Sequence, residues 1–242
     1  MTLLLLAGTG EAQQIARGLA DRQVDAVVSL AGGARMATET DLSCRIGGFG
    51  GDAGFRDYLI EQKITAVLDA THPFAAGISN RTASICAEFD LPYCQVLRPA
   101  WTAQADDRWT YFEREENAAL HIAPGSIVFL ATGRQTLDRF ANLAECTLIC
   151  RQIDPPDRDF PFKNGRFLVG KPPFSVAQEK ALFLELKVDW LVVKNAGGMA
   201  SATKLTAARG LGIPVAMINR PRQPEARKVR TVDEAMDWIA DL

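Results

Sequence analysis

The chain has 242 residues, which is enough for two compact lobes of about 100–120 residues each. Its hydrophobic residues (48%) and charged residues (23%) occur at proportions ordinary for a globular protein with buried cores. No segment approaches the roughly 20 apolar residues of a membrane-spanning helix, and no basic residue precedes the short apolar N-terminus. We therefore expect a cytoplasmic protein without a membrane partner.

The charge is divided unevenly along the chain. Residues 1–120 hold 10 Lys and Arg against 16 Asp and Glu, a net charge of −6, whereas residues 121–242 hold 17 against 13, a net charge of +4. A basic C-terminal half suits a small anionic ligand. No stripe of basic residues is interleaved with aromatic ones, so we expect no nucleic-acid partner. The five Cys are scattered and accompanied by two His, so we expect neither a disulfide framework nor a metal site.

In the first half, apolar runs of strand length alternate with stretches of helical periodicity. This alternation is typical of βαβ units around a parallel sheet. Strands are predicted at residues 3–7, 24–30, 65–70 and 93–97, and helices at about 11–22, 52–63 and 75–89.

The second half begins less regularly, with a short strand at 109–112 and a short helix at 115–122. Strands are then predicted at 126–131, 147–150, 167–169, 190–194 and 214–218, and helices at 135–144, 176–186, 201–209 and 232–240. The pattern predicts an α/β protein with two Rossmann-like parallel-sheet domains, residues 1–112 and 113–242. The boundary is placed to within about 10 residues, and a strand near it can belong to either sheet or be exchanged between them.

A glycine turn follows the first predicted strand and opens the next predicted helix. In that setting, backbone N–H groups and a helix N-terminus can face a phosphate. Gln13 stands at the third glycine position of the usual pattern, so a tight turn without a ligand is the alternative. Gly8, Thr9, Gly10 and Glu11 are therefore candidate cofactor-binding residues.

The end of the second predicted strand carries no acidic residue. NAD enzymes usually place Asp or Glu there, about 20 residues after the glycine turn, to bind the ribose 2′-hydroxyl. Residues 29–35 contain no acid and end in Arg35. An arginine at this place favours a 2′-phosphate, and hence NADPH, although a solvated loop arginine is nearly as good an interpretation.

A histidine follows the third predicted strand, at the edge where ligands bind in open parallel sheets. Because His72 precedes a proline, its backbone is held extended and it does not enter the next helix. His72 is our candidate proton donor, with a turn-capping histidine as the alternative. Its neighbour Thr71 is a further candidate for cofactor binding.

Basic residues gather at the predicted strand ends of both halves. Lys194 ends an apolar strand, and the glycines after it can form a second anion-binding turn. Each basic residue alone is usually a solvated side chain, but as a group they predict a clamp for a polyanion. The candidate substrate-binding residues are Arg98, Thr132, Gly133, Arg134, Lys171, Lys194, Asn195, Gly197, Gly198, Lys204 and Arg220.

Taken in order, these motifs resemble the precorrin-6A reductase family of the cobalamin pathway, over nearly the whole chain. The resemblance is carried by Gly-Thr-Gly-Glu-Ala at 8–12, Asp-Ala-Thr-His-Pro-Phe-Ala at 69–75, Arg-Pro-Ala-Trp at 98–101, Lys-Pro-Pro-Phe-Ser at 171–175, Lys-Asn-Ala-Gly-Gly at 194–198 and the run 204–221. Ala7 stands where the family often has Gly, and Ala196 where it often has Ser. Both departures keep the residue small, whereas Lys171-Pro172-Pro173 is a looser match.

The resemblance implies NADPH-dependent reduction of precorrin-6A to precorrin-6B, with a hydride to C19 and a proton to C18 of the macrocycle. It implies a ring bearing acetate and propionate carboxylates, held in the cleft between two lobes. His72 is then the candidate acid, with bound water as its rival. We expect a monomer or a weak homodimer.

Three other functions remain open on the sequence. One is a cofactor-free tetrapyrrole enzyme of the uroporphyrinogen-III synthase kind, which needs no glycine turn. Another is a non-catalytic NADP(H) sensor, and the third is a different NADPH reductase. Whether the substrate carries cobalt is also open.

Overall fold

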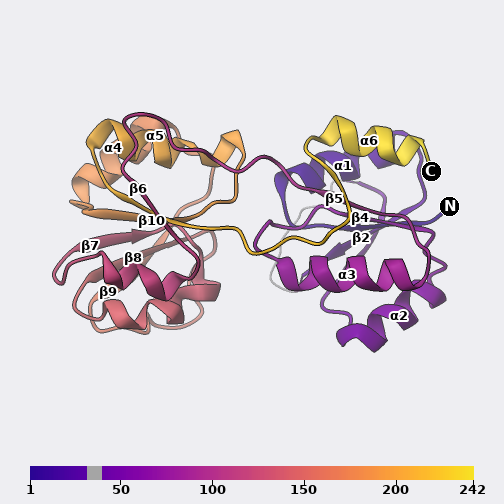
Figure 1. The fold of residues 1–242 in the computed structure, drawn as a ribbon, viewed down its shortest axis with the longest axis horizontal. Helices are drawn as coiled ribbons and strands as arrows, with labels where there is room; N and C mark the ends of the chain where they lie inside the picture. The colour runs from indigo at the N-terminus through magenta and orange to yellow at the C-terminus, as the bar shows by residue number, and fades with distance from the viewer. Residues whose placement is uncertain (32–39) are drawn as a thin grey trace. The chain divides into compact units, whose positions relative to one another are not determined.

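The computed structural model describes residues 1–31 and 40–242. The chain forms two compact units (Figure 1): the first consists of Met1–Pro99 and Pro221–Leu242, and the second of Ala100–Arg220. Each unit contains a six-stranded sheet whose neighbouring strands all run parallel. The predicted α/β class with two parallel sheets is confirmed.

The sheet of the first unit has the strand order β12-β5-β4-β1-β2-β3. Figure 1 shows α1 and α6 on one face of this sheet and α2 and α3 on the other. The elements are β1 (Leu3–Leu6), α1 (Gly10–Asp21), β2 (Ala26–Leu30), β3 (Ser43–Ile46), α2 (Gly51–Glu61), β4 (Ala66–Asp69), α3 (Ala76–Glu88), β5 (Tyr93–Val96), β12 (Arg227–Val229) and α6 (Val232–Ala240).

The central strand β1 is apolar at every position because both of its faces are covered. Leu3 and Leu5 belong to the core cluster that includes residues of α1 and α6. Leu4 and Leu6 belong to a second cluster, with Phe55 of α2 and residues of α3. Successive side chains of a strand point to opposite faces, so an uninterrupted leucine run fits a parallel sheet between two helical layers.

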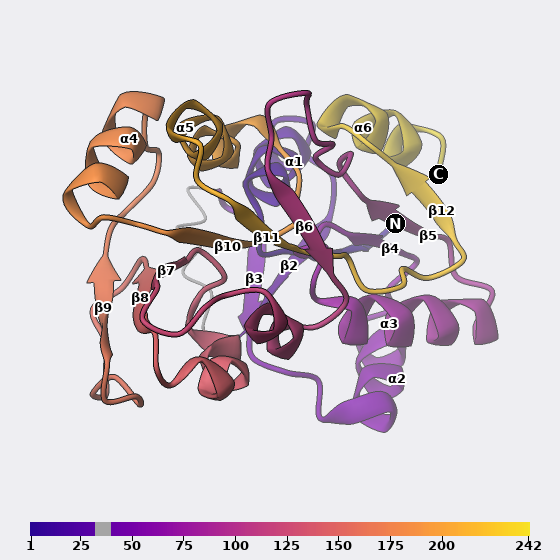
Figure 2. The same ribbon diagram turned by 60° about the vertical axis from the view of Figure 1, so that its left-hand side comes forward.

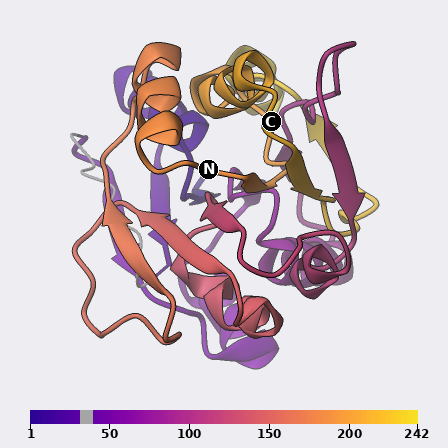
Figure 3. The same ribbon diagram turned by 90° about the vertical axis from the view of Figure 1, so that its left-hand side faces the viewer.

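The sheet of the second unit has the order β6-β11-β10-β7-β8-β9. Figure 3 shows α4 and α5 side by side over one face, and Figure 2 shows β6, β11 and β10 as successive strands. The elements are β6 (Trp109–Phe112), η1 (Glu115–Leu120), β7 (Ile127–Leu130), η2 (Arg134–Leu143), β8 (Thr147–Gln152), β9 (Gly165–Val169), α4 (Val176–Glu185), β10 (Trp190–Lys194), η3 (Met199–Ser201), α5 (Thr203–Leu211) and β11 (Val215–Ile218).

Two segments predicted as α-helices, residues 115–122 and 135–144, form the 3₁₀ helices η1 and η2. The buried apolar residues of η2 are Leu137, Phe140 and Leu143, which are spaced by three. This spacing matches the three residues per turn of a 3₁₀ helix and places all three side chains on one face.

The division of the chain differs from the expected domains 1–112 and 113–242. The strand β6 pairs with β11 and so belongs to the second sheet, while β12 pairs with β5 and α6 contacts α1 in the first unit. Local periodicity shows that a segment is a strand, but not which sheet edge it joins. Neither β3 nor β12 was predicted, because both are edge strands with mostly exposed, polar residues.

Candidate functional site

The glycine turn and the Thr-His-Pro loop lie side by side in the first unit. Strands β1 and β4 are neighbours in register, with Leu6 opposite Asp69, so their carboxyl ends meet. The hydroxyl of Thr9 donates to the carbonyl of Ala70 at 2.8 Å and accepts from the amide of Ala12 at 3.2 Å. Thr9 therefore caps helix α1 and also fixes the turn to the neighbouring loop.

The glycine turn leaves space in front of the N-terminus of α1. Gly8 has φ +148°, a backbone conformation that L side chains rarely adopt. A Cβ atom at Gly8 or Gly10 would meet no described heavy atom within 4 Å. Gly8 and Gly10 are exposed, and a turn with open space before a 12-residue helix fits the approach of a phosphate group.

A buried carboxylate holds the loop after β4. Asp69 is 0% exposed, and its Oδ1 accepts from the amide of Thr71 at 3.0 Å and from the hydroxyl of Thr71 at 2.7 Å. Its Oδ2 accepts from the hydroxyl of Tyr93 at 2.9 Å. Burial, together with the charge of Asp69, raises the pKa of Tyr93, so the phenol remains a donor. The position of Thr71 is thus set from within the sheet.

His72 is half-buried at the start of this loop. Its Nδ1 accepts from the amide of Phe74 at 3.3 Å, and its carbonyl accepts from the amide of Ala75 at 2.7 Å. In a neutral imidazole one nitrogen accepts and the other carries the proton. The acceptor role of Nδ1 therefore places the proton of neutral His72 on Nε2.

Two basic residues of the first unit, Arg98 and Arg45, have partners at the same edge. Arg98 pairs with Glu11, with 2.8 Å between Nη1 and Oε2. Arg35 lies outside the described residues. The sequence analysis missed Arg45, whose guanidinium donates to the Ser29 hydroxyl at 2.8 Å and lies 3.8 Å from the centroid of the Phe49 ring. Arg45 thus places a positive charge beside the carboxyl end of β2, where a 2′-phosphate was expected.

The segment that returns from the second unit also reaches this loop. Gln223 donates from Nε2 to the carbonyl of Pro73 at 2.9 Å and accepts from the side chain of Gln95 at 2.9 Å. The sequence carried no signal for this contact, because 150 residues separate Gln223 from Pro73.

In the second unit, Lys194 ends β10 and lies 3.7 Å from the carboxylate of Glu115, measured between Nζ and Oε1. Glu115 also accepts from Arg139 at 3.0 Å. Burial lowers the pKa of Lys194, and the charge of Glu115 opposes that shift. Burial alone would raise the pKa of Glu115, but hydrogen bonds to its own backbone and to Arg139, together with the charge of Lys194, bring it below its usual value.

Asn195 and Arg220 brace the turn after β10. The Asn195 side chain accepts from the amide of Trp101 at 2.8 Å and donates to the carbonyl of Trp101 at 3.0 Å. Arg220 donates to the carbonyls of Asn195 and Ala196 at 2.7 and 2.9 Å. The glycines that follow, Gly197 and Gly198, have φ of +71° and +87°. Asn195 and Arg220, which were predicted to bind substrate, therefore hold the turn after β10 in place.

The candidate binding residues that follow β7 and β9 differ in their burial and in their partners. Thr132 is buried, and no described group bonds its Oγ1. Gly133, with φ +74°, precedes η2, and the exposed side chain of Arg134 pairs with Asp157 at 2.9 Å. Lys171 is exposed.

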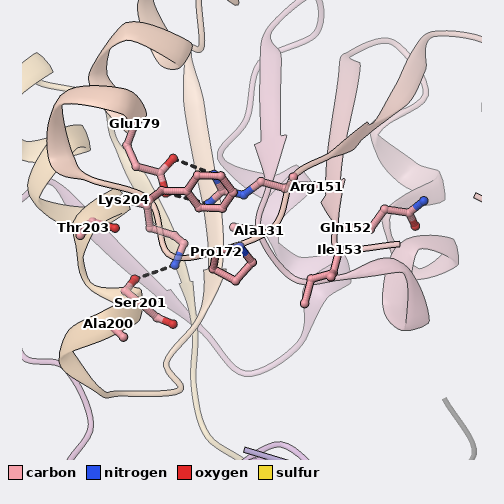
Figure 4. Close-up of a pocket in the computed structure, with 12 residues that line it drawn as sticks. Ala131, Arg151, Gln152, Ile153, Pro172, Glu179, Ala200, Ser201, Thr203 and Lys204 are labelled. Atoms are coloured by element: carbon pink, nitrogen blue, oxygen red, sulfur yellow. Dashed lines mark hydrogen bonds and ion pairs between the residues drawn. The ribbon is translucent and has the colours of Figure 1, made fainter. Parts of the chain in front are cut away.

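A pocket with a volume of about 170 Å³ opens beside the carboxyl end of β8 (Figure 4). Arg151 and Lys204 line it, and Arg151 forms two hydrogen bonds with Glu179, of 2.7 and 2.8 Å. Burial and the charge of Arg151 lower the pKa of Lys204 to about 8, against an opposing effect of Glu179. Lys204 was a predicted substrate-binding residue, but the sequence did not indicate that Arg151 and Glu179 lie near it.

Among the residues that the structure describes, no helix is both long and apolar enough to cross a membrane. No cluster of three or more His, Cys, Asp or Glu side chains there is arranged to hold a metal ion.

Comparison with known proteins gives one consistent result. The family model described as "Precorrin-6x reductase CbiJ/CobK" matches residues 2–240. The chain is 41% identical to the precorrin-6A reductase of Rhodobacter capsulatus over 241 residues, covering 99% of this chain and 96% of that protein. It is also 41% identical to the precorrin-6A reductase of Rhodococcus erythropolis, covering 99% and 98%.

A solved structure agrees with these relatives. The structure of CobK precorrin-6A reductase superimposes with a TM-score of 0.93 at 40% sequence identity, covering 100% of this chain and 97% of that one. The family model spans nearly every residue, and the solved structure shares the fold at 40% sequence identity. The chain belongs to the precorrin-6x reductase CbiJ/CobK family.

Proposed function

We propose that this chain reduces precorrin-6A to precorrin-6B with NADPH, delivering a hydride to C19 and a proton to C18 of the macrocycle. The observation that carries the proposal is the junction of the glycine turn with the Thr-His-Pro loop, through the 2.8 Å bond from Thr9 to Ala70. It holds the N-terminus of α1, which can accept a phosphate, close to the loop that carries His72, at the edge of a parallel sheet where ligands usually bind. Two relatives at 41% identity bear the name precorrin-6A reductase, whereas the Priestia megaterium relative at 27% identity is named cobalt-precorrin-6A reductase; the higher identity of the first two supports the cobalt-free substrate.

In this proposal NADPH binds in the first unit. The amides of Gly8, Thr9 and Gly10 hold its phosphates, with Glu11 and Thr71 beside them. Arg45, which lies at the end of β3 and bonds Ser29, supports recognition of the 2′-phosphate, together with Arg35. When bound, the cofactor supplies the hydride, and the residues of the chain position the reactants.

His72 is the proposed proton donor. Its neutral ring holds a proton on Nε2, since Nδ1 accepts from Phe74, and it lies half-buried beside the glycine turn. A histidine has an unperturbed pKa of about 6.5, close to the pH at which an acid works efficiently. Bound water remains the rival donor.

The substrate carboxylates are proposed to bind basic and amide groups at the strand ends. Arg98, Lys194 and Arg134 each have an acidic neighbour, so in this role they exchange or share that partner. The whole proposed set is Arg98, Thr132, Gly133, Arg134, Lys171, Lys194, Asn195, Gly197, Gly198, Lys204 and Arg220. We also propose that the enzyme is cytoplasmic and works as a monomer or a weak homodimer.

The test adds precorrin-6A to the protein and NADPH and measures oxidation of the cofactor as loss of the absorbance of the reduced nicotinamide. NADH serves as the matched control. We expect oxidation with NADPH and far slower oxidation with NADH. Tight binding of precorrin-6A without oxidation of either cofactor would refute the reductase mechanism and favour a cofactor-free tetrapyrrole enzyme. NADPH binding without turnover of any substrate would favour a sensor.

A further inference from the structure

The pocket beside β8 lies wholly within the second unit, and its walls come from several elements. They are β8, the loop after β9, α4, and the junction of η3 with α5. Its volume of about 170 Å³ is below the roughly 300–1,000 Å³ of sites for drug-sized ligands. It has room for a short side arm of a ligand, but not for a tetrapyrrole-derived ring.

The pocket contains an ammonium group with unused donors. Lys204 donates to the carbonyl of Ser201 at 2.6 Å (Figure 4). Its Nζ also lies 5.9 Å from the centroid of the Trp101 ring. An ammonium has three donors. Among the described residues, Ser201 is the one that accepts a hydrogen bond from Lys204. Because Lys204 lines the pocket, a small acceptor that enters it can bond the remaining donors.

The neighbouring carboxylate does not neutralise this ammonium. Glu179 is 1% exposed, and both of its oxygens accept from the guanidinium of Arg151. That guanidinium carbon also lies 4.5 Å from the centroid of the Phe174 ring. Two cations and one carboxylate leave the pocket with a net positive charge. A half-buried cation without a counter-ion is costly, so an anion that enters would be stabilised.

We propose that this pocket binds one carboxylate arm of the substrate, with Lys204 as the counter-ion and the Arg151–Glu179 pair as the rigid wall that holds it. The inference rests on the proposed function, because the carboxylate belongs to that macrocycle. It adds to that function by assigning one carboxylate arm of the macrocycle to the pocket beside β8. A phosphate of the cofactor has the same recognition chemistry, and the experiment separates the two sources.

The pocket also has a pH dependence of its own. The charged groups that act on Lys204 are Arg151 of β8 and Glu179 of α4, and Trp101 contributes an uncharged ring. The pKa of Lys204 in the empty pocket is about 8. Above this pH the ammonium loses its proton and the carboxylate loses its counter-ion. Affinity for the substrate should therefore fall from pH 8 upwards.

The first experiment compares Lys204→Met and Lys204→Arg with the wild type, using Lys163→Met as a control that removes an exposed charge in the same unit. The measurements are KM and kcat for precorrin-6A and the Kd of NADPH, at pH 7. Loss of one charge-assisted contact should raise KM by roughly 10- to 100-fold for Lys204→Met. The Kd of NADPH should not change, and Lys163→Met should behave as wild type.

The second experiment repeats the KM measurement from pH 7 to pH 10. Wild-type affinity should fall above pH 8, whereas Lys204→Arg should stay flat because arginine keeps its charge throughout. This arm remains decisive if Lys204→Met fails to fold. Parallel pH profiles for wild type and Lys204→Arg would overturn the role of Lys204.

The outcomes separate the subsite from the reductase function. A wild type that does not turn over precorrin-6A refutes both. Normal turnover with an unchanged KM in Lys204→Met refutes the subsite alone. A raised Kd of NADPH with an unchanged KM would assign the pocket to a phosphate of the cofactor and overturn the carboxylate.

Discussion

Asp69 is the residue whose removal tests how the proposed cofactor-binding edge is held together. It is fully buried and accepts three hydrogen bonds, two from Thr71 and one from Tyr93. Asp69→Asn keeps the volume and leaves one oxygen to accept from Thr71. The amide nitrogen that replaces Oδ2 cannot accept from the phenol of Tyr93.

The magnitude follows from the number and type of bonds. A hydrogen bond to a charged group contributes about 1.5–3 kcal/mol, and an unsatisfied buried donor costs about 1–3 kcal/mol. Asp69→Asn should therefore lower the free energy of unfolding by about 2–3 kcal/mol, and Tyr93→Phe by about 1–2 kcal/mol. Asp69→Ala removes both acceptor oxygens and with them all three hydrogen bonds. It should lower the free energy of unfolding by about 3–5 kcal/mol, because the desolvation cost of the buried carboxylate is removed too and offsets part of the loss.

The assay is a double-mutant cycle of Asp69→Asn and Tyr93→Phe, with unfolding followed in urea. The double variant should be less destabilised than the sum of the single ones, by about 1–2 kcal/mol. The Kd of NADPH should rise in Asp69→Ala more than in Asp69→Asn or Tyr93→Phe, since only the alanine variant removes the oxygen that accepts from Thr71. Additive losses, or an unchanged Kd of NADPH, would refute the reasoning.

Four further predictions test other contacts. Thr9→Val removes the cap of α1 and the bond to the neighbouring loop, so it should cost about 1–2 kcal/mol in urea unfolding and weaken NADPH binding, while Thr9→Ser should do neither. Asn195→Ala leaves the amide and the carbonyl of Trp101 without their bonds to this side chain and should lower the free energy of unfolding by about 2–4 kcal/mol. A loss under 1 kcal/mol would show that these two bonds do not stabilise the turn. The pKa of Lys204 is about 8 when folded and 10.5 when unfolded, so the wild type should gain up to about 3 kcal/mol of stability from pH 8 to 10.5, and Lys204→Met should not. A thiol reagent at pH 7.5 should label the exposed Cys44 quickly and the other four cysteines only after unfolding, since burial raises the pKa of Cys86 to about 12; rapid labelling of more than one thiol would contradict this.

Much of the proposed cofactor edge was predictable from local pattern alone. The leucine run of β1 indicated a strand, and the glycines after it indicated a turn into a helix. The histidine of the Thr-His-Pro loop was expected at the edge of the sheet where ligands bind, and the carboxyl ends of parallel strands meet at that edge. The register of Leu6 with Asp69 and the bond from Thr9 to Ala70 agree with this expectation.

The sequence could not show which cations have anionic partners. Lys194 and Arg98 both stood at predicted strand ends and were interpreted alike, whereas Arg151 was not among the candidate substrate-binding residues. In the structure the first lies near Glu115, the second pairs with Glu11 and the third with Glu179. These partners lie 28 to 87 residues away along the chain, and residue spacing carries no information about such pairs.

The sequence by itself determined the class of the elements, the glycine turn, and the family to which the chain belongs. Periodicity and turn residues are local properties, so they can be read without a fold. Only the tertiary structure decided that β12 and α6 return to the first sheet, and that Lys204 enters a pocket whose one carboxylate is already paired. Strand partners, burial and charge balance depend on residues that are distant along the chain and become neighbours only when the chain folds.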